Sequence, residues 1–345
     1  MRLALAALLL LAACTNDAPE PRALRTTTTT TSTTSTTSTT STTTTAPAVP
    51  PPPAPAQPAS TPATKSAAPQ AAPPAAQCGV LPPDNPWNTD VSGLPLHPRS
   101  AQWVASVGLD RNVHPDVGTQ YGIPYVEVPA NQPRVPITFE YADESDPGPY
   151  PIPPNAPIEG GSDRHILVVD RRSCRLWEVF AAETTDGGRS WRAGSGATWD
   201  LRSNALRPEG WTSADAAGLP IFPGLIRYDE VAAGRIAHAL RFTARRTQRA
   251  YISPARHYAS SITDPAVPPM GARFRLRADH DCGRYGPTAR VVCVALQRYG
   301  MLLADNGSDW FITGAPDPRW DDGALNQLKQ IPGSAFEVVD TGGIR

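Results

Sequence analysis

The sequence carries almost no net charge, and this excludes one broad class of partner. Its 345 residues include 31 Lys and Arg against 32 Asp and Glu, a formal net charge of −1. Proteins that bind nucleic acid or anionic lipid through the field of a whole surface carry an excess of positive side chains. We therefore expect no nucleic-acid partner.

The sequence also lacks the short motifs of several enzyme classes. Gly194-Ser195-Gly196 is not the Gly-x-Ser-x-Gly motif of serine esterases, no phosphate-binding glycine loop is present, and no histidine pair has zinc-protease spacing. Serine esterases, nucleotide enzymes and zinc proteases therefore rank low. We predict no cofactor and no metal.

Large apolar side chains are almost missing from residues 26–77. Residues 26–45 are nearly all Thr and Ser, and residues 46–77 are mostly Ala and Pro. Such segments bury too little apolar surface to offset the entropy cost of ordering a backbone. We expect residues 14–77 to form a disordered tether and residues 78–345 to form a single exported domain.

The first residues have the pattern of an export signal. An apolar run follows Arg2 and is too short to span a bilayer as a helix. It ends Leu-Ala-Ala before Cys14, which resembles a bacterial lipobox, and acylation there would hold the protein on the outer face of the cell membrane. Residues 1–13 would then be a lipoprotein signal peptide, and the alternative is an ordinary signal peptide with a chance cysteine.

The remaining four cysteines predict two disulfides, since an exported domain folds in an oxidising compartment. Three pairings are formally possible. We favour Cys282 with Cys293, which closes a short loop, and Cys78 with Cys174, which would clamp the start of the domain onto a hairpin. A zinc site is the weaker alternative, because the spacings do not suit paired cysteine ligands.

Short strands broken by Pro, Gly and Asp predict an all-β fold, specifically a jelly-roll-like β-sandwich with a few short helices. Residues 165–170 and 175–180 flank a tight turn and predict a hairpin. Residues 236–242 alternate in polarity, so a strand there would place His238 among large apolar side chains. Further strands are expected at 125–128, 137–141, 274–279, 310–313 and 336–339, and helices at 288–299 and after Asp321 or Asp322.

A first candidate cluster runs from Glu159 to His165 and leads into the expected hairpin. Acids and histidines in glycine-rich segments or at strand ends lie where a sandwich builds a cleft. We predict catalytic roles for Asp163, for His165 and for Glu178 on the second strand. The competing interpretation is that a histidine at a strand start is an ordinary surface residue.

A second cluster lies in the polar stretch 204–230, whose length and content of Trp, Arg and acids indicate an ordered loop. Its composition is typical of a sugar subsite, because an aromatic face stacks on a pyranose ring while guanidinium and carboxylate groups bind hydroxyls. We predict a catalytic Asp215 and substrate binding by Arg207, Trp211, Arg227 and Tyr228. The alternative is a structural ion pair between Arg207 and Asp215.

Three further histidine and acid clusters remain. His238 is a candidate general acid or base if it lines a concave sheet face, and otherwise a buried histidine held by one carboxylate. Arg256-His257 and Asp279-His280-Asp281 are weaker candidates, the latter as an unspecific metal pair. Residues 305–310 lack the ligand spacing of a calcium loop and predict a tight turn.

Three stretches, residues 204–220, 234–240 and 299–307, resemble a group of uncharacterised exported bacterial proteins, over about residues 87–339. The fold implied by the resemblance is similar to the concanavalin A-like jelly rolls of many glycanases and lectins. That likeness is an analogy, and a fold does not fix a function.

Together these features predict a surface-tethered, carbohydrate-active protein, a monomer that cleaves a polysaccharide or cell-wall glycan by carboxylate or histidine acid–base catalysis. Such an enzyme would be a glycoside hydrolase or a polysaccharide lyase. The alternatives are a non-catalytic glycan- or wall-binding lipoprotein and a purely structural envelope protein.

Overall fold

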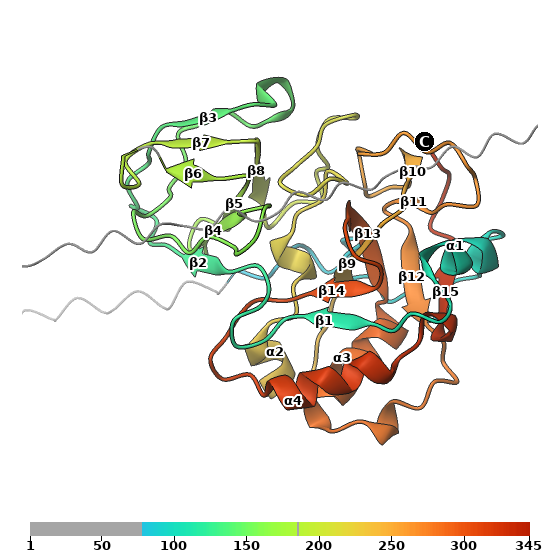
Figure 1. The fold of residues 1–345 in the computed structure, drawn as a ribbon. Helices are drawn as coiled ribbons and strands as arrows, with labels where there is room; N and C mark the ends of the chain where they lie inside the picture. Colours follow the sequence, from blue (N-terminus) through green and yellow to red (C-terminus); the bar gives the residue numbers. More distant parts are fainter. Residues whose placement is uncertain (1–77, 185) are drawn as a thin grey trace, which may run out of the picture. The chain divides into compact units, whose positions relative to one another are not determined.

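Strands supply most of the regular structure in the computed structural model, which describes residues 78–184 and 186–345 (Figure 1). Of the described residues, 26% are in strands and 17% are helical. They all belong to one compact unit. The prediction of a β-rich domain with few short helices is therefore confirmed.

The predicted hairpin forms the centre of a four-stranded sheet. The strands, in the order β2-β4-β5-β8, are β2 (Tyr125–Glu127), β4 (Ile166–Asp170), β5 (Arg175–Phe180) and β8 (Ser195–Asp200). β4 and β5 pair antiparallel, whereas β2 joins β4 in parallel. Asp170 closes the hairpin turn, because its carboxylate accepts hydrogen bonds from the backbone N–H groups of Arg172 and Ser173.

The two faces of this sheet pack against two different cores. In β5, Trp177 and Val179 belong to a smaller core, whereas Leu176 belongs to the main core of the domain. Alternation along the strand places Glu178 on the side of the main core, where it is fully buried. Both faces are covered, which explains why these strands read as nearly continuous apolar runs.

A three-stranded sheet closes the smaller core. Its strands, in the order β3-β7-β6, are β3 (Ile137–Phe139), β7 (Trp191–Ala193) and β6 (Glu183–Thr184). β3 runs parallel to β7, and β6 runs antiparallel to it. Ile137 and Trp191 lie opposite each other in this register and are both buried in the smaller core.

A six-stranded mixed sheet carries most of the main core. Its strands, in order, are β1 (His114–Asp116), β14 (Phe311–Thr313), β9 (Leu240–Ala244), β13 (Met301–Asn306), β12 (Arg273–Leu276) and β15 (Phe336–Val339). β9 pairs with β13 in parallel and with β14 antiparallel. The remaining two strands, β10 (Gln248–Tyr251) and β11 (Pro269–Met270), form a separate parallel pair. Every strand range expected from the sequence overlaps an observed strand. All the sheets except the β10–β11 pair mix parallel with antiparallel neighbours.

The strand expected at residues 236–242 begins later than predicted. β9 starts at Leu240, so His238 precedes the strand. The backbone N–H of Ala239 donates to the carbonyl oxygen of Trp87, and only the N–H of Leu240 reaches the neighbouring strand region at Gly300. His238 is nevertheless buried, at 4% exposed, as the alternation predicted.

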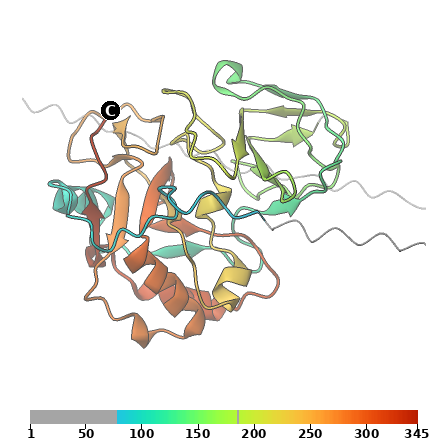
Figure 2. The same cartoon turned by 180° about the vertical axis from the view of Figure 1, so that it is seen from behind.

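Four short helices complete the domain: α1 (Ser100–Val107), α2 (Tyr228–Ala232), α3 (Pro287–Arg298) and α4 (Asp322–Leu325). Figures 1 and 2 show α2, α3 and α4 gathered at one side of the six-stranded sheet. α3 confirms the helix expected at 288–299 and begins at a proline, whose fixed φ suits a first helical turn. Asp321 accepts a hydrogen bond from the Ala324 N–H and caps α4, as expected.

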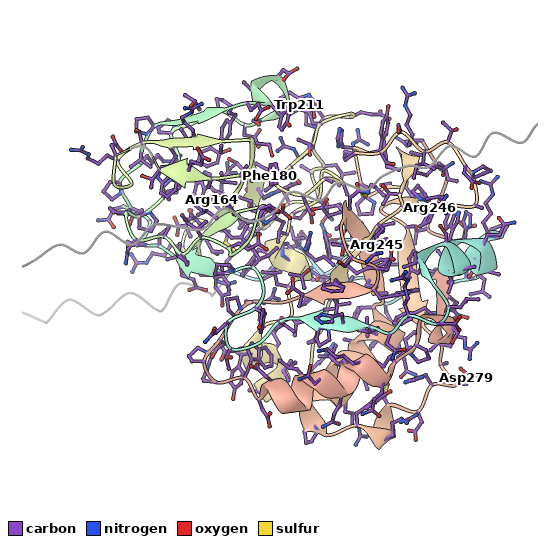
Figure 3. The ribbon with its side chains drawn as sticks, viewed as in Figure 1. Arg164, Phe180, Trp211, Arg245, Arg246 and Asp279 are labelled. Atoms are coloured by element: carbon purple, nitrogen blue, oxygen red, sulfur yellow. A yellow bond between two sulfur atoms is a disulfide. The ribbon has the colours of Figure 1, made fainter. Side chains whose placement is uncertain are left out.

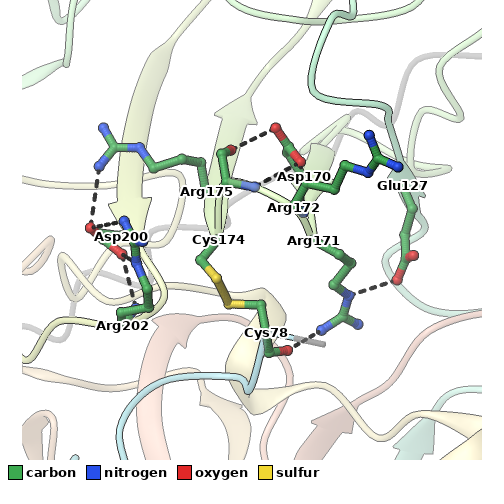
Figure 4. Close-up of a disulfide and its surroundings, with 10 residues drawn as sticks. Cys78, Glu127, Asp170, Arg171, Arg172, Cys174, Arg175, Asp200 and Arg202 are labelled. Carbon is green, nitrogen blue, oxygen red and sulfur yellow. Dashed lines mark hydrogen bonds and ion pairs between the residues drawn. A yellow bond between two sulfur atoms is a disulfide. The ribbon is translucent and has the colours of Figure 1, made fainter. Parts of the chain in front are cut away.

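Both predicted disulfides are confirmed, Cys78–Cys174 and Cys282–Cys293. The first joins the start of the described chain to the β4–β5 turn, where Figure 4 shows it among ion-paired side chains such as Arg171–Glu127. The second ties the turn before α3 to the helix itself.

Among residues 78–184 and 186–345, no helix is long and apolar enough to cross a bilayer. The predicted signal peptide, the lipidation of Cys14 and the tether lie outside the described residues.

Candidate functional site

A cavity of about 460 Å³ brings together acids, a histidine and two aromatic rings. The ends of β5, β8 and β13 contribute Phe180, Ser195 and Asp305, and loops contribute the rest. The lining also includes Tyr141, Glu144, Asn306, His257 and the segment from Thr212 to Ala216. Figure 3 labels Phe180, one of the two aromatic residues that line the cavity. The other, Tyr141, is 47% exposed. These features make the cavity the strongest candidate site.

A buried arginine lies beneath the cavity and holds two acids near each other. Arg241, on β9, is bound by both carboxylate oxygens of Asp215, with N–O distances of 2.9 and 2.7 Å. Nη2 of Arg241, which donates to Asp215, also lies 3.7 Å from Asp305 Oδ2. Nη1 of Arg241 donates to the Thr313 hydroxyl. The register between β9 and β13 shifts between Leu303 and Asp305, and such an irregularity re-aims a side chain.

Asp305 is an acid that favours its protonated form. Burial raises the pKa of its carboxyl well above the usual range, and the negative charge of Asp215 raises it further, against the opposing effect of Arg241. Its side chain is still 19% exposed. An aspartic acid that keeps its proton near neutral pH and faces a cavity can donate that proton to a ligand.

Glu144 and His257 form the second titratable group of the cavity. The carbonyl oxygen of Ala216 accepts a hydrogen bond of 2.7 Å from His257 Nδ1, which fixes the tautomer and leaves Nε2 free. That Nε2 lies 3.9 Å from Glu144 Oε2, which also accepts the N–H of Thr212. The side chains of Glu144 and His257 are 34% and 23% exposed, so both can reach a ligand.

His165 supports the cavity from behind. Its two ring nitrogens lie 2.5 Å from Glu159 Oε2 and 2.9 Å from the Ala214 carbonyl oxygen. Both partners only accept, so both nitrogens donate and the ring is a cation. Burial alone would lower the pKa of His165, but the hydrogen bond and charge of Glu159 raise it. His165 is 2% exposed and positions the loop that carries Asp215.

Glu178 is a second buried acid with an altered pKa. Its carboxylate accepts hydrogen bonds from the backbone N–H groups of Ile221 and Phe222 and from Trp199 Nε1. Burial raises the pKa of Glu178 to about 7, against the lowering effect of these donors. The side chain is fully buried and joins β5 to the loop before α2.

The structure corrects the expected grouping of Arg207, Trp211 and Asp215. Arg207 pairs with Asp146 at 2.7 Å, whereas Asp215 pairs with Arg241. The Arg207 guanidinium lies 5.4 Å from the ring centre of Trp211, so one aromatic face is already occupied. The alternative Arg207–Asp215 ion pair does not form, because each of these two charges has a partner on a more distant segment. Sugar binding by Arg207 and Trp211 stays a prediction.

Other predicted site residues lie apart from the cavity. His238 Nδ1 donates to the Ala239 carbonyl oxygen, and its Nε2 lies 3.0 Å from Arg227 Nη2 and 3.2 Å from Glu230 Oε2. His238 therefore matches the alternative expectation of a buried histidine held by one carboxylate. Tyr228 packs edge-on against Trp320. Asp163 is exposed and accepts from its neighbour Ser162. Of the five predicted catalytic residues, only Asp215 lines the cavity.

A second cavity, of about 270 Å³, is lined by Trp87, Trp199 and Arg207. Both tryptophans are nearly buried, at 2% and 7% exposed, and Arg207 is ion-paired. This second cavity therefore offers little exposed aromatic surface for a sugar ring and no unpaired acid and base side chains for catalysis.

No three His, Cys, Asp or Glu side chains within residues 78–184 and 186–345 are placed to share a metal ion. At the suggested metal pair, Asp279 is 74% exposed and pairs with Arg277, while Asp281 accepts the N–H of Gly283.

Three residues that line the cavity, Asp305, Glu144 and His257, are not among the predicted catalytic or substrate-binding residues. Asp305 was expected in a tight turn, but it lies within β13, at the end of an apolar run. Polar residues directly after an apolar run, at the end of a strand, are the sequence signal that could have identified Asp305. His257 belongs to the weaker candidate pair Arg256-His257, and Glu144 carries no local signal in the sequence.

Searches against protein-family models, curated proteins and solved structures found no match. The chemistry of the cavity is therefore the basis for a functional interpretation.

Proposed function

We propose that the protein is a surface-tethered, carbohydrate-active enzyme that cleaves a glycan in the 460 Å³ cavity. The supporting observation is that Asp305, whose pKa is raised, lines the same cavity as Glu144 and His257. Acid–base cleavage of a glycosidic bond needs one group that holds a proton and one that takes a proton from water.

Asp305 is the proposed general acid. Its proton passes to the oxygen of the leaving sugar as the glycosidic C–O bond breaks. Asp215 is paired with Arg241, and its negative charge helps Asp305 keep the proton until it is needed. Asp215 is fully buried, so we assign it to positioning and charge tuning.

His257, supported by Glu144, is the proposed base. A water molecule attacks the anomeric carbon, and its proton passes to His257 Nε2 or to the Glu144 carboxylate beside it. One water is consumed for each bond cleaved, and the product carries a new reducing end. Tyr141 and Phe180 supply aromatic surface at the cavity, which suits the apolar face of a sugar ring.

The location of this activity is part of the proposal. The lipobox-like Leu-Ala-Ala-Cys14 and the following low-complexity segment support a lipid anchor and a long tether on the outer face of the membrane. A jelly-roll-like sandwich remains a prediction about the fold, and the proposed chemistry does not depend on it.

The test is incubation of the full chain with a panel of wall and plant polysaccharides, with readouts for new reducing ends and for unsaturated-sugar absorbance. Asp305→Asn should lower the rate of cleavage about 10²- to 10⁴-fold. The matched control is Asp279→Asn, since Asp279 is exposed and lies well away from Phe180 in Figure 3.

Equal cleavage by Asp305→Asn and the wild type would refute the assignment of Asp305. Retention on a glycan without any product would favour the non-catalytic binding protein instead. Circular dichroism of each variant would show that the fold is kept.

A further inference from the structure

The charges around the cavity restrict the sugar that it can hold. Its lining residues include three carboxylic acids, Glu144, Asp215 and Asp305, and one histidine, but no Arg or Lys. A sugar that bears a carboxylate, sulfate or phosphate group is normally bound through guanidinium or ammonium groups.

The nearest guanidinium groups are already engaged. Arg241 is only 4% exposed in its side chain and is held by both oxygens of Asp215. Arg207 donates from Nε to the Thr212 carbonyl oxygen, on the backbone of a lining residue, and its Nη1 pairs with Asp146. Neither cation is available to neutralise an anionic ligand.

The free polar groups of the cavity are mostly acceptors. Asn306 lines the cavity, and its buried Oδ1 has no hydrogen-bond partner. The Glu144 carboxylate, 34% exposed, accepts only one backbone N–H, and its Oε1 has no hydrogen-bond donor within the described chain. Ser195 uses its hydroxyl proton on the Ser213 carbonyl oxygen, so it too presents lone pairs to a ligand.

An acceptor-rich cavity selects a ligand that donates hydrogen bonds. Sugar hydroxyls do so, whereas a uronate carboxylate presents two further acceptors and a negative charge. Such a group would lose its hydration next to the negative charge of Glu144 without gaining a cation, which disfavours binding.

We propose that the cavity binds an uncharged, hydroxyl-rich sugar and rejects sugars that carry carboxylate, sulfate or phosphate groups. This inference rests on the proposed function and names its substrate class. It also favours hydrolysis over β-elimination, because elimination cleaves next to a uronate carboxylate that must be neutralised in the site.

The experiment compares glycans of one linkage that differ only in charge. Calorimetry with the full chain would measure three pairs: β-1,4-linked manno-oligosaccharides and oligomannuronates, β-1,4-linked gluco-oligosaccharides and oligoglucuronates, and oligogalacturonates with and without methyl esters. In at least one pair, the uncharged member should bind roughly tenfold more tightly or better.

Glu144→Gln keeps an acceptor for the Thr212 N–H but removes the charge, so it should reduce this ratio roughly threefold or more. Glu140→Gln is the matched control, because Glu140 is exposed on the same segment, does not line the cavity and should leave the ratio unchanged. A ratio unaffected by Glu144→Gln would contradict the inference.

The outcomes separate this inference from the proposed function. Equal or tighter binding of uronates, or their cleavage, would overturn the inference and leave glycan cleavage intact. Binding of uncharged members without any new reducing ends would overturn the proposed function alone. Binding of no member of any pair would overturn both.

Discussion

The buried carboxyl of Glu178 should make the stability of the domain depend on pH. Its pKa lies near 7 in the folded protein, against an ordinary value of 4.5. The unfolded chain therefore releases this proton at lower pH than the folded chain. The stabilisation due to the folded chain's tighter proton binding is complete below about pH 4.5 and is lost as the pH rises through 7.

The size of the effect follows from the shift in pKa. Each pKa unit corresponds to about 1.4 kcal/mol, and about 2–3 kcal/mol of the stability due to Glu178 should be lost between pH 5 and pH 8. Glu178→Gln cannot titrate and should lack this component. It should also be less stable than the wild type at pH 8, because the ionised carboxylate accepts only N–H donors there and the amide would turn an N–H donor of its own toward them, at a cost of about 1–3 kcal/mol.

The assay is urea unfolding of the full chain at pH 5 and pH 8, followed by tryptophan fluorescence. Other groups also titrate, so the decisive quantity is the difference in pH dependence between the wild type and Glu178→Gln. Glu183→Gln is the control, since Glu183 is exposed on β6 and should follow the wild type. Equal pH dependence in the wild type and Glu178→Gln would refute the reasoning.

Two further predictions concern the stability of the fold. Replacing Cys78 and Cys174 together by Ser should lower the free energy of unfolding by about 4–5 kcal/mol, against roughly 3 kcal/mol for the same change at Cys282 and Cys293. The first disulfide closes the longer loop, with a sequence separation of 96 residues against 11. Equal urea midpoints for the two double variants would contradict this. Gly122→Ala should lower the melting temperature by several degrees, because Gly122 has φ of 109° and a Cβ there would meet the Gly314 carbonyl oxygen. An unchanged melting temperature in calorimetry would refute the strain argument.

Local sequence signals were enough to predict much of the secondary structure. The hairpin of β4 and β5 has two apolar runs and a turn fixed by the side chain of Asp170. α3 begins at Pro287 and is followed by Gly300, which has a positive φ of 62°. These features depend on residues close in sequence, so spacing and turn chemistry determine them.

The pairing of distant strands had no such signal. β9 and β13 pair in parallel although about 60 residues separate them, and this pairing brings Asp305 to Arg241. Asp215 and Arg207 are close in the chain and were expected to lie side by side. Both charges found partners on segments whose proximity depends on the tertiary fold, so the candidate site could be predicted only in part.

The most direct test of the account is the pH dependence of glycan cleavage by the full chain, measured as kcat/KM from pH 4 to pH 10. The raised pKa of Asp305 predicts that activity persists through neutral pH and falls as this acid ionises, far above the pH near 4 at which an ordinary aspartic acid loses its proton. Asp305→Asn should abolish this alkaline limb together with most of the activity. Cleavage by Asp305→Asn with the rate and pH profile of the wild type would contradict the central claim.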